Sequence, residues 1–200
     1  MNLGIVVEGF GEVAAAPILI RRLANLLNPS ITLHVPQPYR LSRYKLIKAG
    51  EIEKAVDFMA RRVGPDGAVL VLIDADDDCP ATLGPALVER ARAARPDHHV
   101  SVVLATREFE AWFLAGAVSL RGARTLPSDL DPPNQPEQIS GAKEWLSTRM
   151  TSGYSETLDQ PAFAAALDLV SARRSDSFDK LVRDLSALLG VSAPPRPSPS

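Results

Sequence analysis

Short apolar runs rich in β-branched residues alternate with longer stretches of helical period along the first half of the chain. This alternation is typical of parallel strands joined by crossover helices. It predicts strands at Leu3–Val7, Ile31–Val35, Ala68–Ile73 and Val100–Ala105. Helices are predicted between the strands, each ending just before a proline-containing pair, because proline keeps the preceding residue out of helical geometry: Val13–Leu27, Glu51–Val63 and Leu83–Ala94.

The second half of the chain has a different pattern, with helices but no further strand. The helices are predicted at Phe109–Ala115, Ala142–Arg149, Ala162–Val170 and Phe178–Leu189. Between the first two lies a long loop rich in Pro, Asp and Asn, Arg121–Gln138. Long loops in compact domains are more often functional than inert, so we expect this one to border a site or a partner.

This pattern predicts an α/β core at residues 1–116 and a helical extension at residues 117–190 that packs on the core. Residues 191–200 are mostly Pro, Ser and Ala. Such a composition buries too little apolar surface to offset the entropy of ordering the chain, so we predict a disordered tail.

Composition narrows the class of protein. With 200 residues, 46% of them hydrophobic, the chain can build a sizeable core. Its single cysteine, Cys79, excludes an internal disulfide, and no Cys/His cluster has zinc-site spacing. No apolar run is long enough to cross a bilayer, and the amino terminus lacks a signal-peptide pattern. We therefore expect a cytoplasmic protein that contacts no membrane.

The net charge of −2 argues against a nucleic-acid coat protein, whose affinity would come from bulk positive charge. One local segment is basic, however, and it contains two tyrosines and four cations: Tyr39, Arg40, Arg43, Tyr44, Lys45 and Lys48. Cations suit phosphate contacts, and aromatic rings suit base stacking. We predict nucleic-acid binding by Arg40, Arg43, Tyr44, Lys45 and Lys48, with a solvated surface loop as the alternative.

Acidic residues follow two of the predicted strands. Glu8 comes directly after the first strand, and Glu12 follows the Gly9-Phe10-Gly11 turn. The third strand runs into Asp74-Ala75-Asp76-Asp77-Asp78, which places four carboxylates in five positions. Because the carboxyl ends of strands in an open α/β sheet meet at one edge, we expect these side chains to converge.

Closely spaced carboxylates repel one another, and a nearby cation relieves this repulsion. Two of them about 4 Å apart repel by roughly 1 kcal/mol even at the dielectric of bulk water. Mg²⁺ binds one or two protein carboxylates and keeps several waters, and Mn²⁺ accepts the same oxygen ligands. Simpler roles stay open: Glu8 pairing with an arginine, Glu12 complementing a helix amino terminus, and the aspartates capping the next helix.

The fourth strand ends in Arg107 and Glu108, which would lie at the same edge and complete the site. The aromatic stripe Phe109, Trp112 and Phe113 has helical spacing and is predicted to be core. Glu110 is interpreted as a solvated helix residue.

These residues carry a resemblance to a known family. The chain resembles the DUF4276 family of small stand-alone Toprim-like proteins, related to the Toprim domain of overcoming-lysogenization-defect nucleases. The matching motifs are Val7–Glu12, Asp74-Ala75-Asp76 with Asp78, and Arg107–Leu114, and looser agreement extends to Lys143 and Tyr154–Gln160.

The resemblance implies a Toprim-like, Rossmann-like fold with a mostly parallel four-stranded sheet flanked by helices. It implies that Glu8, Asp74 and Asp76 bind Mg²⁺ and support phosphodiester chemistry. Glu12, Asp78 and Glu108 would be additional metal ligands, as in relatives that use two ions.

The expected function is metal-dependent hydrolysis of nucleic acid, DNA rather than RNA, and the resemblance suggests a role in phage defence. Arg107 and Lys143 are candidates to offset the charge that develops on the phosphate. An alternative is a metal-binding regulatory subunit that acts only with a separate ATPase, since the chain has no phosphate-binding loop of its own. A receiver-like phospho-acceptor domain using Thr106 is a further alternative, although the expected acidic pair after the first strand is missing. Homo-oligomer formation is left open.

Overall fold

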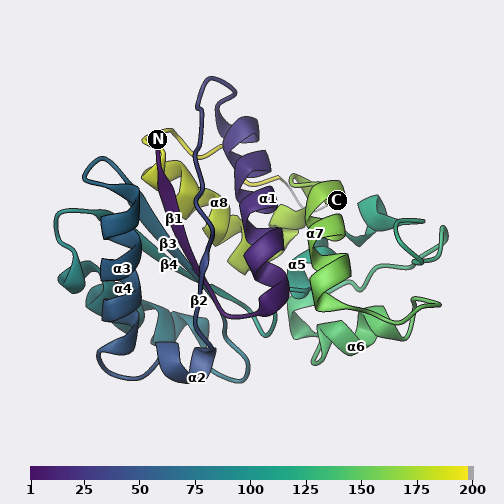
Figure 1. Cartoon of the computed structure of the whole chain (residues 1–200). Coiled ribbons are helices and arrows are strands. Elements are labelled where there is room, and N and C mark those ends of the chain that lie inside the picture. The colour runs from purple at the N-terminus through teal and green to yellow at the C-terminus, as the bar shows by residue number, and fades with distance from the viewer. Residues whose placement is uncertain (198–200) are drawn as a thin grey trace.

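The computed structural model describes residues 1–197 and has an α/β architecture built on one parallel sheet (Figure 1). The sheet has four strands in the order β2-β1-β3-β4. They are β1 (Leu3–Val7), β2 (Tyr39–Arg40), β3 (Ala68–Asp74) and β4 (His99–Ala105). All three pairings are parallel. Every residue of β1 and β3 is buried, as expected for strands covered by helices on both faces.

Helices cover both faces of the sheet and divide its side chains between two hydrophobic cores. Helices α1 (Phe10–Leu27) and α8 (Asp176–Leu188) share one core with Leu3 and Ile5 of β1, and α7 (Glu156–Ala166) packs against α1. Helices α3 (Glu51–Val63) and α4 (Pro80–Ala94) pack over Val6 and the alternate residues of β3. In Figure 1, α3 and α4 lie on one side of the sheet and α1 and α7 on the other.

The predicted α/β fold class is confirmed, and most element bounds agree closely. β1 and α3 have the predicted bounds, whereas α1 and α4 each begin three residues earlier than predicted. The remaining elements are α2 (Arg43–Leu46), α5 (Ala111–Ala115), α6 (Ala142–Ser147) and the 3₁₀ helices Ala117–Leu120, Pro136–Gln138 and Ser171–Arg174.

The predicted strand at Ile31–Val35 is wrong. In this segment only His34 pairs with the sheet, through an isolated bridge to Asn2, and the strand itself forms later, at Tyr39–Arg40. Pro36 and Pro38 lie between these two points of contact. Since proline has no N–H to donate, it interrupts the hydrogen-bond ladder that would join them.

The predicted helix at Ala162–Val170 is also displaced. Helix α7 begins six residues earlier, at Glu156, and ends at Ala166. Pro161 is the sixth residue of this helix. Because proline has no N–H to donate, the carbonyl four residues earlier lacks its helical hydrogen bond, and that carbonyl lies in the first turn. The proline is therefore tolerated near the helix start instead of marking a boundary.

The long loop and the carboxyl-terminal segment are both anchored by side chains. Glu137, in the last turn of the loop, accepts hydrogen bonds from the N–H groups of Asp176 (3.2 Å) and Ser177 (2.9 Å) at the start of α8. Arg173 donates to the carbonyls of Pro194 and Pro195, both at 2.9 Å. The predicted disordered tail is therefore held against the core at these residues, and its last part, 198–200, lies outside the described residues. In the described part of the chain, no helix combines the length and the apolar character needed to span a membrane.

Candidate functional site

Glu8 and Asp74 meet at the carboxyl edge of the sheet, as the topology predicts. Asp74 is the last residue of β3, and Glu8 follows β1, the neighbouring strand. The Glu8 carboxylate accepts a long hydrogen bond (3.4 Å) from the backbone N–H of Asp74. The Asp74 carboxylate is buried, and its Oδ1 accepts the N–H of Phe109 at 2.8 Å. Burial raises the pKa of Glu8, and the charge of Asp76 adds to this.

Glu12 folds back from the first turn of α1 toward this edge. Its carboxylate accepts the backbone N–H groups of Glu8 and Gly9, both at 3.2 Å. It thus complements the helix amino terminus, one of the two roles predicted for it. The side chain is only 4% exposed. Burial raises the pKa of Glu12 to about 8, with further contributions from the charges of Glu110 and Glu8.

Glu110 is the residue that sequence reasoning misjudged. It was expected to be solvated, but it is fully buried, next to the aromatic core. Its Oε1 accepts the hydroxyl of Tyr154 at 2.9 Å and the amide of Gln160 at 2.7 Å. Its Oε2 has no hydrogen-bond partner among the described residues. One signal could have found it: Glu110 is the only charged residue in the run Phe109–Ala115.

The carboxylates of this edge repel one another with little compensation. Burial raises the pKa of Asp74 well above its ordinary value, and the charges of Glu12, Glu110 and Glu8 raise it further. The cation that opposes this is Lys143. Burial disfavours its charge, but the nearby carboxylates outweigh burial and raise the pKa of Lys143, so it stays protonated.

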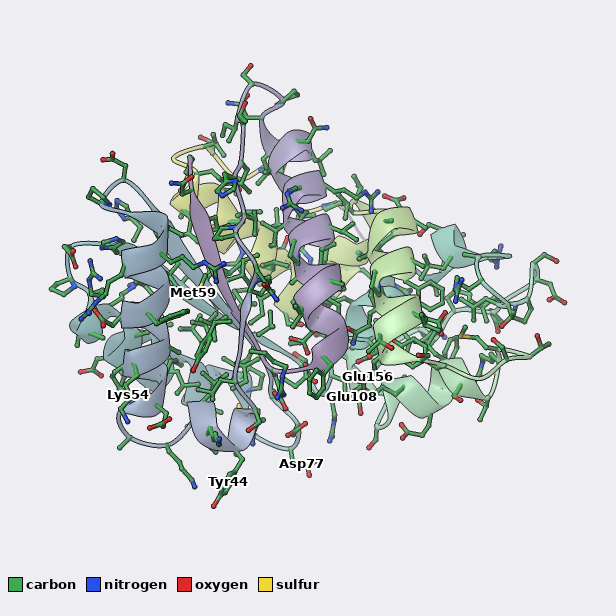
Figure 2. All side chains as sticks on the ribbon, in the orientation of Figure 1. Tyr44, Lys54, Met59, Asp77, Glu108 and Glu156 are labelled. Atoms are coloured by element: carbon green, nitrogen blue, oxygen red, sulfur yellow. The ribbon has the colours of Figure 1, made fainter. Side chains whose placement is uncertain are left out.

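Lys143 and Glu108 connect this cluster to the helical extension. Lys143 pairs through Nζ with Glu156 Oε1 at 2.8 Å, and its backbone N–H donates to Glu108 Oε2 at 3.1 Å. Figure 2 shows Glu108 and Glu156 in the lower middle of the view, below the start of α1. Glu108 therefore helps to fix the start of α6 beside the carboxylate cluster.

Arg43 braces the loop that follows β3. Its guanidinium donates to the carbonyls of Asp74 (2.9 Å) and Ala75 (3.2 Å), and it pairs with the carboxylates of Asp76 (3.4 Å) and Asp78. Only 15% of the side chain is exposed. Arg43 thus neutralises the outer aspartates, and its charge also opposes the rise in the pKa of Glu8.

Arg107 lies opposite this loop. The N–H of Asp76 donates to the Arg107 carbonyl at 2.9 Å, and both residues have left-handed backbone geometry, with φ values of 49° and 66°. The Arg107 guanidinium pairs with Asp77 at 2.8 Å. An open pocket of about 430 Å³ lies here, and its walls include Asp76, Thr106, Arg107, Glu137 and Gln138. The end of the long loop, Glu137 and Gln138, borders this pocket.

The other predicted nucleic-acid contacts lie at the same edge. Arg40, Tyr44, Lys45 and Lys48 are all exposed, whereas Arg43 is not. Tyr44 and Asp77 both point outward at the lower edge in Figure 2.

The site has the oxygen donors that Mg²⁺ or Mn²⁺ prefers, namely the carboxylates of Glu8, Asp74 and Asp76. Within residues 1–197, however, no three His, Cys, Asp or Glu side chains are grouped so that they could hold a metal ion as they stand. Two observations fit a cation nonetheless: the unpartnered Oε2 of Glu110 and the raised pKa values of the buried carboxyls. Binding would require the carboxylates to turn toward a common centre.

Comparison with known families identifies the chain. The model of a family described as a domain of unknown function, DUF4276, matches residues 7–186, so the chain belongs to this family. Neither curated proteins nor solved structures gave a match.

Proposed function

We propose that this protein is a divalent-metal-dependent hydrolase of nucleic-acid phosphodiester bonds, of the Toprim type that its sequence resembles. The observation that carries the proposal is the convergence of carboxylates from β1, α1, β3 and the segment after β4. Burial raises the pKa values of Glu8, Glu12, Asp74 and Glu110, and the charges of Glu8 and Glu110 raise those of Glu12 and Asp74 further. Lys143 opposes the shifts of Asp74 and Glu110. Clustered, perturbed carboxyls at the edge of a parallel sheet are a feature of functional sites.

Two kinds of charge could relieve this repulsion, protons or a bound cation. A proton on Glu110 would neutralise its carboxyl, whereas a cation could also use its unpartnered Oε2 as a ligand. Glu8, Asp74 and Asp76 would be the principal ligands, with Glu12, Glu108, Asp78 and Glu110 as further candidates. Such an ion polarises a phosphoryl oxygen and lowers the pKa of a bound water.

The chain's own cations would position the substrate. Lys143 stays protonated beside the carboxylates and can offset negative charge on a phosphate. Arg107 lines the open pocket, where its pairing with the highly exposed Asp77 can be exchanged for a phosphate. Arg43 has a different role, because its bonds hold the Asp74–Asp78 loop in place.

The test has two parts, ion binding and cleavage. Calorimetric titration with Mg²⁺ and Mn²⁺ should show uptake by the wild type and strong loss in Glu8→Gln and Asp74→Asn. A supercoiled-plasmid assay should show nicking that is lost in the same variants. Asp66→Asn is the matched control, since Asp66 is an exposed aspartate near the opposite end of β3.

The outcomes separate the alternatives. Absence of ion uptake by the folded wild type would refute the proposal. Ion uptake without nicking would favour a metal-binding subunit that needs a partner ATPase. Stable labelling by acetyl phosphate would favour a receiver-like domain instead.

A further inference from the structure

The carboxyl edge of the sheet carries two exposed aromatic rings beside the candidate site. Phe10 is 67% exposed and Tyr44 is 69% exposed. Phe10 is two residues after Glu8, and Tyr44 adjoins Arg43, which braces the acidic loop. In the described residues just one further large aromatic is exposed, Phe58, at 48%. Two of the three exposed rings therefore lie at the candidate site.

Each of the two rings is associated with a cation. The guanidinium of Arg40 lies 3.8 Å from the centre of the Phe10 ring, and the ammonium of Lys48 lies 3.7 Å from the centre of the Tyr44 ring. With these cations in place Phe10 is still 67% exposed and Tyr44 69% exposed, so much of each ring faces solvent. A ring with a free face and an adjacent cation suits a base and its phosphate together.

The cations of this surface are also available for a ligand. Within the described chain, Arg40, Lys45 and Lys48 form no ion pair with any carboxylate, whereas Arg43 forms two. Phosphates can therefore pair with these three side chains without displacing a carboxylate.

We propose that Phe10 and Tyr44, with Arg40, Lys45 and Lys48, form a stacking platform for single-stranded nucleic acid that leads into the carboxylate site. The inference rests on the proposed function, and it specifies the substrate as a single strand or an unpaired region. In a duplex the bases are stacked on one another and cannot stack on side chains unless they unpair. A platform of exposed rings therefore favours unpaired bases, and it does so without reading sequence.

The experiment measures binding without cleavage. Fluorescence anisotropy in excess EDTA would compare a labelled single strand of about 12 nucleotides, a duplex of the same sequence and the matching RNA strand. Single strands should bind more tightly than the duplex. Phe10→Ala and Tyr44→Ala should each weaken single-strand binding at least about fivefold, because stacking on one ring contributes to each base bound. Tyr44→Phe should retain binding.

Phe58→Ala is the control, since it removes an exposed phenylalanine from α3 that packs beside Tyr39 and has no cation from residues 1–197 over its ring. Urea midpoints establish that the variants are folded. Equal affinity for duplex and single strand, or no effect of either aromatic substitution, would overturn the platform. So would a loss of self-association in Phe10→Ala and Tyr44→Ala with nucleic-acid affinity unchanged, which would make these rings a contact between copies of the chain.

The two proposals fail in different ways. Single-strand binding in EDTA with no nicking in Mg²⁺ would preserve the platform and refute the hydrolase. Nicking of the plasmid that is unaffected by Phe10→Ala and Tyr44→Ala would preserve the hydrolase and refute the platform.

Discussion

Buried Glu12 makes the metal-free protein less stable as pH rises from 6 to 8. The pKa of Glu12 is about 8 in the folded protein, against an ordinary value of 4.5. Over this range the folded state therefore still holds a proton that the unfolded chain has already released. The contribution of Glu12 to stability is greatest below pH 4.5 and is lost progressively until pH passes 8.

The size of this stability loss follows from the pH range over which only the folded state holds the Glu12 proton. One proton bound only by the folded state changes the free energy of unfolding by about 1.4 kcal/mol per pH unit. Between pH 6 and 8 the loss is about 2 kcal/mol, because titration is half complete at the upper limit. For a domain of this size that corresponds to a fall of roughly 4–8 °C in the unfolding temperature. Asp74 and Glu110 are shifted in the same direction and add to the effect.

Urea unfolding in EDTA at pH 6, 7 and 8 measures this loss. Glu12→Gln should reduce the pH dependence by about one proton, even if the loss of one hydrogen bond to the Glu8 or Gly9 N–H lowers its stability overall. Glu89→Gln, which changes an exposed glutamate on α4, should keep the wild-type dependence. A wild-type midpoint that is constant or rises toward pH 8 would refute the reasoning, as would an unchanged dependence in Glu12→Gln.

Three further predictions follow from the structure. Mg²⁺ should raise the unfolding temperature more at pH 8 than at pH 6, because the ion competes with protons for the buried carboxyls; equal shifts would contradict this. Gly11→Ala should lower stability by about 1–3 kcal/mol in urea unfolding, because its Cβ would overlap the Gln160 side chain and the Glu156 carbonyl; an unchanged midpoint would contradict it. Arg173→Met should cost about 3 kcal/mol by the same measurement, since it removes a 2.7 Å ion pair and leaves Asp179 buried; a loss below about 1 kcal/mol would show that Asp179 is well compensated.

The sequence predicted the sheet well where one physical signal dominated. β1, β3 and β4 are buried on both faces and therefore appear as continuous apolar runs. β2 is an edge strand of two residues, Tyr39–Arg40, and its pairing depends on where two prolines interrupt the ladder. The segment Ile31–Val35, in which apolar and polar residues alternate, was the stronger local signal, but it makes only one bridge to the sheet.

The candidate site was predictable only in part, for a similar reason. The meeting of Glu8 and Asp74 follows from parallel topology, because both residues end adjacent strands. The contribution of Glu110 depends on tertiary packing, since its partners Tyr154 and Gln160 are more than 40 residues away in sequence. No local pattern specifies such a contact. A single charged residue within an aromatic stripe indicates only that its side chain is a candidate for burial.

Helix α2 explains why the basic segment was predicted as a single surface but has two roles. It spans only Arg43–Leu46, too short for a periodic signal, yet its geometry points successive side chains in different directions. Arg43 points inward and holds the loop of Asp74 and Asp78, while Tyr44 and Lys45 face solvent. A strand bound to the outer face of α2 would thus contact the same four-residue helix that fixes the acidic loop. Under the proposed function, substrate bound to this face would therefore act on the same helix that holds the carboxylate loop in place.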